Sequence, residues 1–190
     1  MKELAATAAS LLTFAIFVPY ALGIVRGRLR PSAASWSIWA FGTALVAGAQ
    51  FGAGAGVGAA PLALSASVSL GIAILAACAG GGFRATRIDL TSFLVALAAG
   101  FAWWRADDAR VAVVLLTAID LVGFVPMLRR SWSRPQDESA GFYALGALRN
   151  FFVLLALEAW NLVTVLFPLA VGIACLVVAG GLLARRRALN

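Results

Sequence analysis

The sequence predicts an all-α, polytopic membrane protein with seven transmembrane helices, arranged as two parallel three-helix repeats joined by a linker helix. The first observation behind this prediction is the composition. Of 190 residues, 63% are hydrophobic and only 12% are charged, and the mean hydropathy is +0.96. Soluble domains are nearer half apolar and a quarter charged. We therefore expect the lipid bilayer to surround nearly the whole chain.

The second observation is an internal repeat. An offset of 107 residues separates Pro19 from Pro126, and the same offset separates the Pro-Leu-Ala triplets at 61–63 and 168–170. A basic loop and a serine-containing start to the next apolar segment follow both Pro19 and Pro126. Two landmarks that share one offset indicate a duplication. The predicted units are a first repeat at 1–82, a linker helix at 83–108 and a second repeat at 109–190.

Seven apolar segments are long enough to cross the hydrocarbon layer, which takes ~20 helical residues. Backbone groups must be satisfied within each segment there, so these segments are predicted to be helices rather than strands. They cover residues 4–25, 33–53, 60–80, 88–104, 110–128, 139–158 and 165–184.

Local signals justify the first three helices in order. The first helix ends at a basic loop that starts at Arg26, and serines within 32–35 begin the second. The glycine-rich run at 52–58 predicts a turn, and Pro61 suits the first turn of the third helix. Glycines at 80–82 then end that helix.

The remaining helices depend partly on the repeat. The helix at 88–104 has no counterpart and acts as the linker that lets the two units run parallel. The apolar run at 142–183 is too long for one helix and has no obvious break. The repeat predicts a hairpin around Trp160 and Asn161, with Pro168 opening the last helix.

Basic residues predict the orientation of the chain. Eleven of them lie in the loops after helices one, three and five and at the C-terminus, and three lie on the other side. The eleven are Arg26, Arg28, Arg30, Arg84, Arg87, Arg129, Arg130, Arg134, Arg185, Arg186 and Arg187, against Lys2, Arg105 and Arg110. By the positive-inside rule, the C-terminus is cytoplasmic and the N-terminus is outside, which requires an odd number of spans.

Several function classes are disfavoured by the same sequence. The net charge of +7 lies in short loops between apolar segments, which indicates membrane topology rather than nucleic-acid binding. There is no histidine, and Cys78 and Cys175 have no metal or redox spacing. We therefore expect no enzyme, no metal and no cofactor. The N-terminal segment lacks the basic start and short apolar core of a secretory signal, and is predicted to be an uncut first helix.

The three-one-three plan, with a proline near the cytoplasmic end of the first helix of each repeat, resembles the PQ-loop superfamily. That group includes the SWEET and SemiSWEET sugar transporters and lysosomal amino-acid exporters. Its Pro-Gln pair is here Pro19-Tyr20 and Pro126-Met127. The resemblance implies a small-solute transporter of the bacterial plasma (inner) membrane. It also allows a homo-oligomer.

A second resemblance is to the Pnu-type nicotinamide riboside transporters. These bacterial proteins have a related three-one-three plan and a Trp-x-x-Trp motif. Residues 36–39, Trp-Ser-Ile-Trp, fit that motif. The resemblance adds nucleosides and vitamin precursors to the substrates that the chain is expected to accept.

Charged residues within membrane helices are costly and call for a reason. Asp120 and Arg149 lie about nine and eleven residues from the cytoplasmic ends of their helices, which at ~1.5 Å per residue is ~13–17 Å deep. Equal depth on neighbouring helices predicts an Asp120–Arg149 ion pair, with Asn150 beside it. Such a pair is either a substrate or proton site near the midplane or a structural link between two helices. The positions 107 residues earlier are Thr13 and Gly42.

Aromatic and proline residues supply further candidates. Trp36 and Trp39 are three residues apart on one helical face, where they can stack against a sugar or nucleoside ring or form an interfacial aromatic belt. Pro19 and Pro126 each remove a backbone hydrogen bond and are candidate hinges. Static prolines are also common in membrane helices.

Polar residues gather near the outer ends of the second and sixth helices. They form a candidate outer gate, or are simply exposed at the membrane interface. The residues are Gln50, Glu158, Trp160 and Asn161.

Two functions remain open from the sequence. The first is a transporter of a sugar, an amino acid, or a nucleoside or vitamin precursor, in which rocking of the two repeats about Pro19 and Pro126 opens a central site alternately to each side. Uptake of a proton by Asp120 would make this transport depend on pH. The alternative is a receptor or accessory subunit that shares the fold without transporting, since fold does not fix function.

Overall fold

The computed structural model describes residues 1–27, 33–79, 87–106, 108–133 and 139–189, without the side chains of residues 88, 89, 92, 106 and 122–133. Within these ranges the chain is all-helical, with seven α-helices and one short 3₁₀-helix, which confirms the predicted class and number of helices. The α-helices are α1 (Lys2–Val25), α2 (Ala33–Gly52), α3 (Ala60–Cys78), α4 (Arg87–Ala106), α5 (Ala109–Ser133), α6 (Ala140–Ala156) and α7 (Leu162–Leu189), and η1 (Gly56–Ala59) precedes α3.

The turn between α2 and α3 forms where the glycines predict it. Gly54 and Gly56 have φ angles of +81° and +58°, which disfavour residues with a side chain. Pro61 lies in the first turn of α3, where its missing N–H costs nothing. The sequence prediction for this turn is confirmed.

The turn between α6 and α7 occupies residues 157–161, so the hairpin predicted around Trp160 and Asn161 is also confirmed. The Asn161 Oδ1 accepts hydrogen bonds from the backbone N–H groups of residues 163 and 164, at 3.0 and 3.1 Å, and so caps α7. Because this cap begins α7 at Leu162, Pro168 lies inside the helix. The prediction that Pro168 opens the last helix is wrong.

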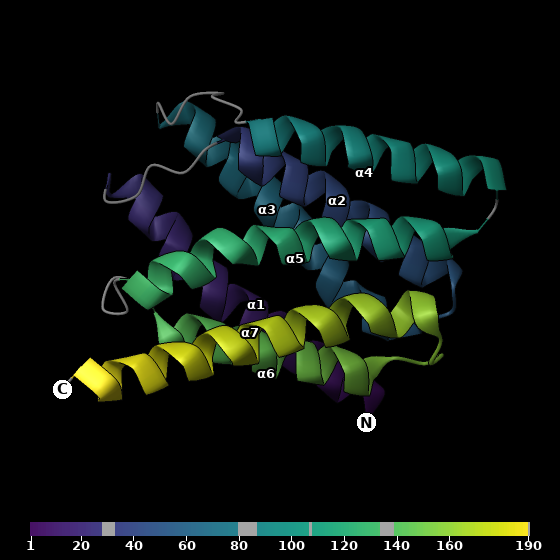
Figure 1. Ribbon diagram of the computed structural model, residues 1–190. Coiled ribbons are helices and arrows are strands. Elements are labelled where there is room, and N and C mark those ends of the chain that lie inside the picture. Colours follow the sequence, from purple (N-terminus) through teal and green to yellow (C-terminus); the bar gives the residue numbers. More distant parts are fainter. Residues whose placement is uncertain (28–32, 80–86, 107, 134–138, 190) are drawn as a thin grey trace.

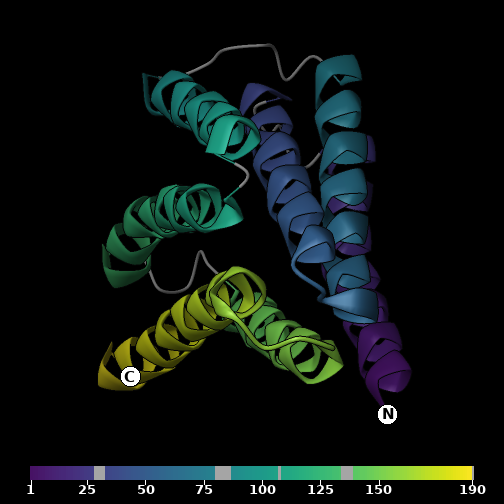
Figure 2. The ribbon, with the colours of Figure 1, turned by 90° about the vertical axis from the view of Figure 1, so that its right-hand side faces the viewer.

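Helix contacts define how the chain is arranged. α3 packs against both α1 and α2, and α7 packs against both α5 and α6. Across the molecule, α1 packs against α6 and α2 packs against α5, while α4 packs against α5 and α2. Figure 1 shows the two termini at opposite ends of the bundle, and Figure 2 shows α1, α2 and α3 on one side of it.

Small residues allow these helices to approach closely. Among the described residues, one cluster of buried side chains joins α2, α3, α4, α5 and α7, and half of its members are alanine. They are Val46, Ala47, Leu62, Ala96, Ala99, Ala112, Leu116 and Phe167. Such packing is typical of helices that associate in lipid, where no hydrophobic effect drives them together.

The outward face of the bundle is apolar. Leu11 and Phe14 on α1 are 65% and 45% exposed, and Ile173 and Leu176 on α7 are 52% and 61% exposed. Three helical segments in the described part of the chain are long and apolar enough to span a membrane: Lys2–Val25, Gly56–Cys78 and Leu162–Leu189. This surface is consistent with an integral membrane protein.

Candidate functional site

Arg149 is buried on α6 and reaches α1 and α3. Its Nε donates to the Thr13 hydroxyl at 2.8 Å, and its Nη2 donates to the Ser65 hydroxyl at 2.6 Å and to the Pro61 carbonyl at 2.8 Å. Nη1 makes a longer contact of 3.5 Å with the Asn150 Oδ1. The guanidinium is therefore satisfied by neutral oxygen atoms, and Arg149 as a whole is only 7% exposed.

The ion pair expected between Asp120 and Arg149 is absent from the described residues, whereas Arg110 and Asp108 do form an ion pair, with an Nε–Oδ1 distance of 3.8 Å. Depth along the helices is a poor guide here because α7 packs against both α5 and α6. Arg149 points instead toward α1 and α3. Asn150 is also engaged elsewhere, since its Nδ2 donates to the Gly146 carbonyl at 2.9 Å. Arg149 and Asn150 thus form a sealed cluster, apart from Asp120.

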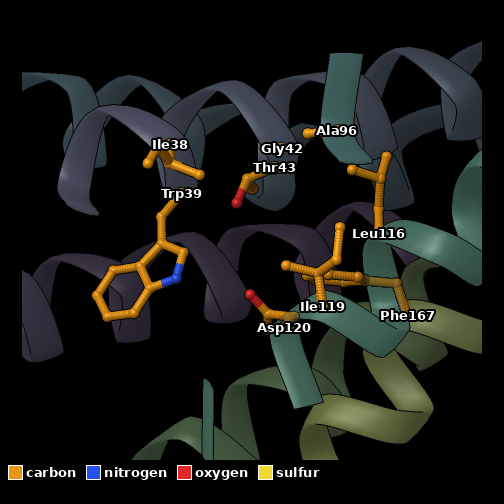
Figure 3. Close-up of a pocket in the computed structure, with 9 residues that line it drawn as sticks. All are labelled: Ile38, Trp39, Gly42, Thr43, Ala96, Leu116, Ile119, Asp120 and Phe167. Atoms are coloured by element: carbon orange, nitrogen blue, oxygen red, sulfur yellow. The ribbon is translucent and has the colours of Figure 1, made fainter. Parts of the chain in front are cut away.

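Asp120 faces a small cavity between α2 and α5, to which α4 and α7 also contribute. The cavity volume is about 20 Å³, which is enough for one water molecule. Its wall consists of Ile38, Trp39, Gly42, Thr43, Ala96, Leu116, Ile119, Asp120 and Phe167. In Figure 3 the Asp120 carboxylate and the Thr43 hydroxyl point toward each other across this space, and the indole nitrogen of Trp39 is turned toward them.

The Asp120 carboxylate is unpaired in the part of the chain that the structure describes. It forms no hydrogen bond or ion pair with any residue that the structure describes. A carboxylate within the hydrophobic part of a membrane protein is costly unless it has a partner or a function. Asp120 is therefore the strongest candidate site residue in the described chain.

The two candidate tryptophans have different environments. Trp36 is 8% exposed and is packed among aromatic rings, with centroid distances of 5.9 Å to Phe17, 5.1 Å to Tyr20 and 5.3 Å to Trp39. Trp39 is 36% exposed and lines the Asp120 cavity. The structure places Trp39 beside the cavity and Trp36 behind it, in the core.

The turn between α2 and η1 and the turn between α6 and α7 are joined by hydrogen bonds. The backbone N–H groups of Glu158 and Ala159 donate to the carbonyls of Ala55 and Gly54, both at 3.1 Å. The Glu158 Oε1 accepts from the N–H of residue 57 at 3.2 Å. We call this contact between residues 53–58 and 157–161 the loop clasp.

Two of the other candidate gate residues extend the loop clasp. The Asn161 Nδ2 donates to the Ala53 carbonyl at 3.0 Å, and the Gln50 Nε2 donates to the Thr164 carbonyl at 2.9 Å. Trp160 is 65% exposed. The structure therefore brings Gln50, Glu158 and Asn161 together and leaves Trp160 at the surface.

Glycine is required where the two turns meet. A Cβ on Gly56 would collide with the Glu158 carboxylate, and its φ of +58° also disfavours a side chain. A Cβ on Gly58 would come within 2.8 Å of the Leu157 backbone. The loop clasp is thus a close backbone contact that larger residues would open.

Sequence reasoning missed three contributors: Thr13, Ser65 and Thr43. Ser65 was not distinguishable from the other serines of its helix, and Thr43 carries no motif. Thr13 did carry a signal, because it precedes Asp120 by 107 residues and Gly42 precedes Arg149 by the same offset. The structure places Thr13 against Arg149 and places Gly42 and Asp120 on one cavity.

The candidate hinges are only partly described. Pro19 lies inside α1, near its C-terminal end. Pro126 belongs to the stretch whose side chains lie outside the described residues. Within the described residues, no group of three or more potential metal ligands comes together.

Comparison of this chain with protein-family models, with characterised proteins and with solved structures gives no significant match.

Proposed function

We propose that this chain is a membrane transporter for a small solute, which works by alternating access between residues 1–82 and 109–190. The observation that carries the proposal is the Asp120 carboxylate, which has no partner among the described residues and lines a cavity to which both units contribute. Transporters bind their substrates near the midplane, at the interface between repeated units. A carboxylate at such an interface has a use there that it lacks in simple packing.

The pattern of helix contacts supports two equivalent units. In each unit the third helix packs against the first and the second: α3 against α1 and α2, and α7 against α5 and α6. The first helix of each unit also packs against the second helix of the other unit: α1 packs against α6, and α5 packs against α2. The linker helix α4 packs outside this arrangement, on α5 and α2.

Individual residues show the same equivalence between the two units. Thr13 bonds Arg149 where α1 meets α6, and the residues related to them by the 107-residue offset are Asp120 and Gly42. Those two line the cavity where α5 meets α2. Equivalent positions in the two units thus meet at equivalent interfaces.

The loop clasp supports the second element of the proposal, an outer gate. Its hydrogen bonds link residues 53–58 of one unit with residues 157–161 of the other. The proposed orientation, with the N-terminus outside and the C-terminus in the cytoplasm of a bacterial inner membrane, puts the loop clasp on the outer side. The described conformation is then closed to the outside, and opening requires the units to separate about hinges at Pro19 and Pro126.

One observation favours the alternative, a receptor or accessory subunit of a larger membrane complex. Arg149 is sealed in packing, as a purely structural charge would be. The Asp120 cavity is the counter-observation, because a structural role for that carboxylate would provide it with a partner.

Uptake by reconstituted protein separates the two functions. Proteoliposomes are supplied with sugars, amino acids, nucleosides, vitamin precursors and small amines, at two pH values. The proposal expects uptake of at least one solute, lost in Asp120→Asn and retained in Asp108→Asn, which removes an exposed carboxylate at the start of α5. No uptake of any solute by well-folded protein would favour the alternative.

A further inference from the structure

We infer that the Asp120 cavity binds the positively charged, ammonium-sized group of the solute, with Asp120 as its counter-ion and Trp39 as its aromatic wall. This inference rests on the proposed function and adds the chemical class of the substrate. Four features of the cavity carry it.

The first feature is the charge. The Asp120 carboxylate brings a negative charge into an otherwise uncharged wall, and within the described residues it has neither a cation nor a hydrogen-bond donor. In a medium of low dielectric constant an opposite charge is attracted far more strongly than in water. The group that best stabilises this cavity is therefore a cation.

The second feature is the choice of neighbours. Trp39 offers an indole ring, which is the best side chain for cation–π contact. The Thr43 hydroxyl faces Asp120 across the space, so it can accept a hydrogen bond from the same cation (Figure 3). The remaining wall is apolar and offers a neutral polar solute little to bond with.

The third feature is size. A volume of about 20 Å³ matches one water molecule, and an ammonium group is of similar size. A whole sugar ring does not fit this space, so the cavity receives one group of the solute rather than the solute entire.

The fourth feature is the matching interface between α1 and α6. There the chain supplies its own cation, the Arg149 guanidinium, which lies against Thr13. The position equivalent to Arg149 at the α2–α5 interface is Gly42, which has no side chain, and the position equivalent to Thr13 is the acidic Asp120. One interface is thus filled by a protein cation, and the other combines an anion with empty space.

The test uses the purified full-length protein in detergent and measures the thermal midpoint with matched pairs of solutes. The pairs are methylammonium with methanol, ethanolamine with ethylene glycol, and putrescine with 1,4-butanediol, in a potassium buffer. We expect at least one cation to raise the midpoint while its neutral partner does not. In Asp120→Asn the apparent Kd should weaken by roughly 30-fold or more, because one partner of a desolvated charge pair is lost.

Two further variants sharpen the result. Asp108→Asn should bind like the wild type, since it removes a carboxylate that is exposed and outside the cavity. Trp39→Leu should weaken binding by roughly 2- to 30-fold, the range expected for loss of a cation–π contact.

The inference is overturned if no cation binds better than its neutral partner, or if Asp120→Asn binds the cation unchanged. It is also overturned if sodium alone stabilises the protein through Asp120 while the amines do nothing, since the site would then hold an inorganic ion. These failures are distinct from failure of the proposed function. Uptake of a neutral solute alone would refute the inference that the substrate is a cation and would support the transport function. Cation binding without any uptake would support the cation site and refute the transport function.

Discussion

Replacing Thr13 with valine removes the oxygen that accepts the 2.8 Å hydrogen bond from the Arg149 Nε. Valine has nearly the same shape as threonine, so the helix packing around position 13 is preserved. The Thr13 hydroxyl also donates to the Ala9 carbonyl at 2.9 Å, but that carbonyl keeps its place in the helical ladder. The change therefore isolates one buried hydrogen bond to a charged donor.

The expected cost can be bounded from two sides. Hydrogen bonds to charged groups contribute ~1.5–3 kcal/mol in soluble proteins. Hydrogen bonds between membrane helices contribute less, on average ~0.6 and at most ~1.7 kcal/mol. Because Thr13 is 0% and Arg149 7% exposed, the lost acceptor cannot be replaced easily by water, and the two ranges overlap near ~1.5 kcal/mol. For a chain of this length that corresponds to a fall of about 3–6 °C in the thermal midpoint.

The assay is thermal unfolding in detergent, with Thr7→Val as the matched control. Thr7 makes the same kind of intrahelical hydrogen bond, to the Glu3 carbonyl at 2.8 Å, but it is exposed on α1. We expect the control to change stability by less than ~0.5 kcal/mol. In an Arg149→Leu background, Thr13→Val should cost much less than in the wild type, because the two residues are coupled. Equal effects of Thr7→Val and Thr13→Val, or no coupling to Arg149, would refute this account of the α1–α6 interface.

Three other changes test the rest of the structure. Gly56→Ala should open the loop clasp and lower the thermal midpoint. Gly52→Ala is the control, since its Cβ would meet no atom within 4 Å, and it should leave the midpoint unchanged. Equal midpoints of the two variants in thermal unfolding would argue against a close contact at Gly56. Single cysteines are placed at Lys2 or Arg187 in a chain without its native cysteines. An impermeant maleimide should label position 2 from the outside and position 187 from the inside. Labelling of both positions from the same side would contradict the seven-span topology. Trp36→Ala should lower the thermal midpoint by more than any other single change proposed, since large-to-small changes of buried aromatic residues cost ~3–5 kcal/mol, and an unchanged midpoint would contradict its place in the aromatic core.

The sequence predicted the helices well because their signals are local or repeated. Each apolar segment became a helix whose ends lie within a few residues of those expected, and Pro61 and the glycines near 54 mark the first turn as predicted. The hairpin at 157–161 has no strong local signal, and the repeat supplied it. The prediction for Pro168 was wrong because the Asn161 cap starts α7 earlier, which leaves the proline inside the helix.

The candidate site was harder to predict because the position of a residue along a helix does not determine the direction of its side chain around that helix. Asp120 and Arg149 stand out in the sequence as charged residues within apolar segments, but the expected pairing between them is absent from the described residues. Arg149 bonds Thr13 and Ser65, which are too ordinary in type to stand out in a sequence. Asp120 faces Thr43, and only the packing of α2 against α5 reveals that.

The most direct test of alternation between two units is the distance across the loop clasp. Spin labels are attached to cysteines that replace Phe51 and Trp160, which are exposed and belong to different proposed units. Measured by pulsed electron resonance in lipid nanodiscs, the wild type should show a short distance and a longer one. Gly56→Ala should shift the population toward the longer distance. A single short distance, identical in the wild type and in Gly56→Ala, would contradict a clasp that opens and closes.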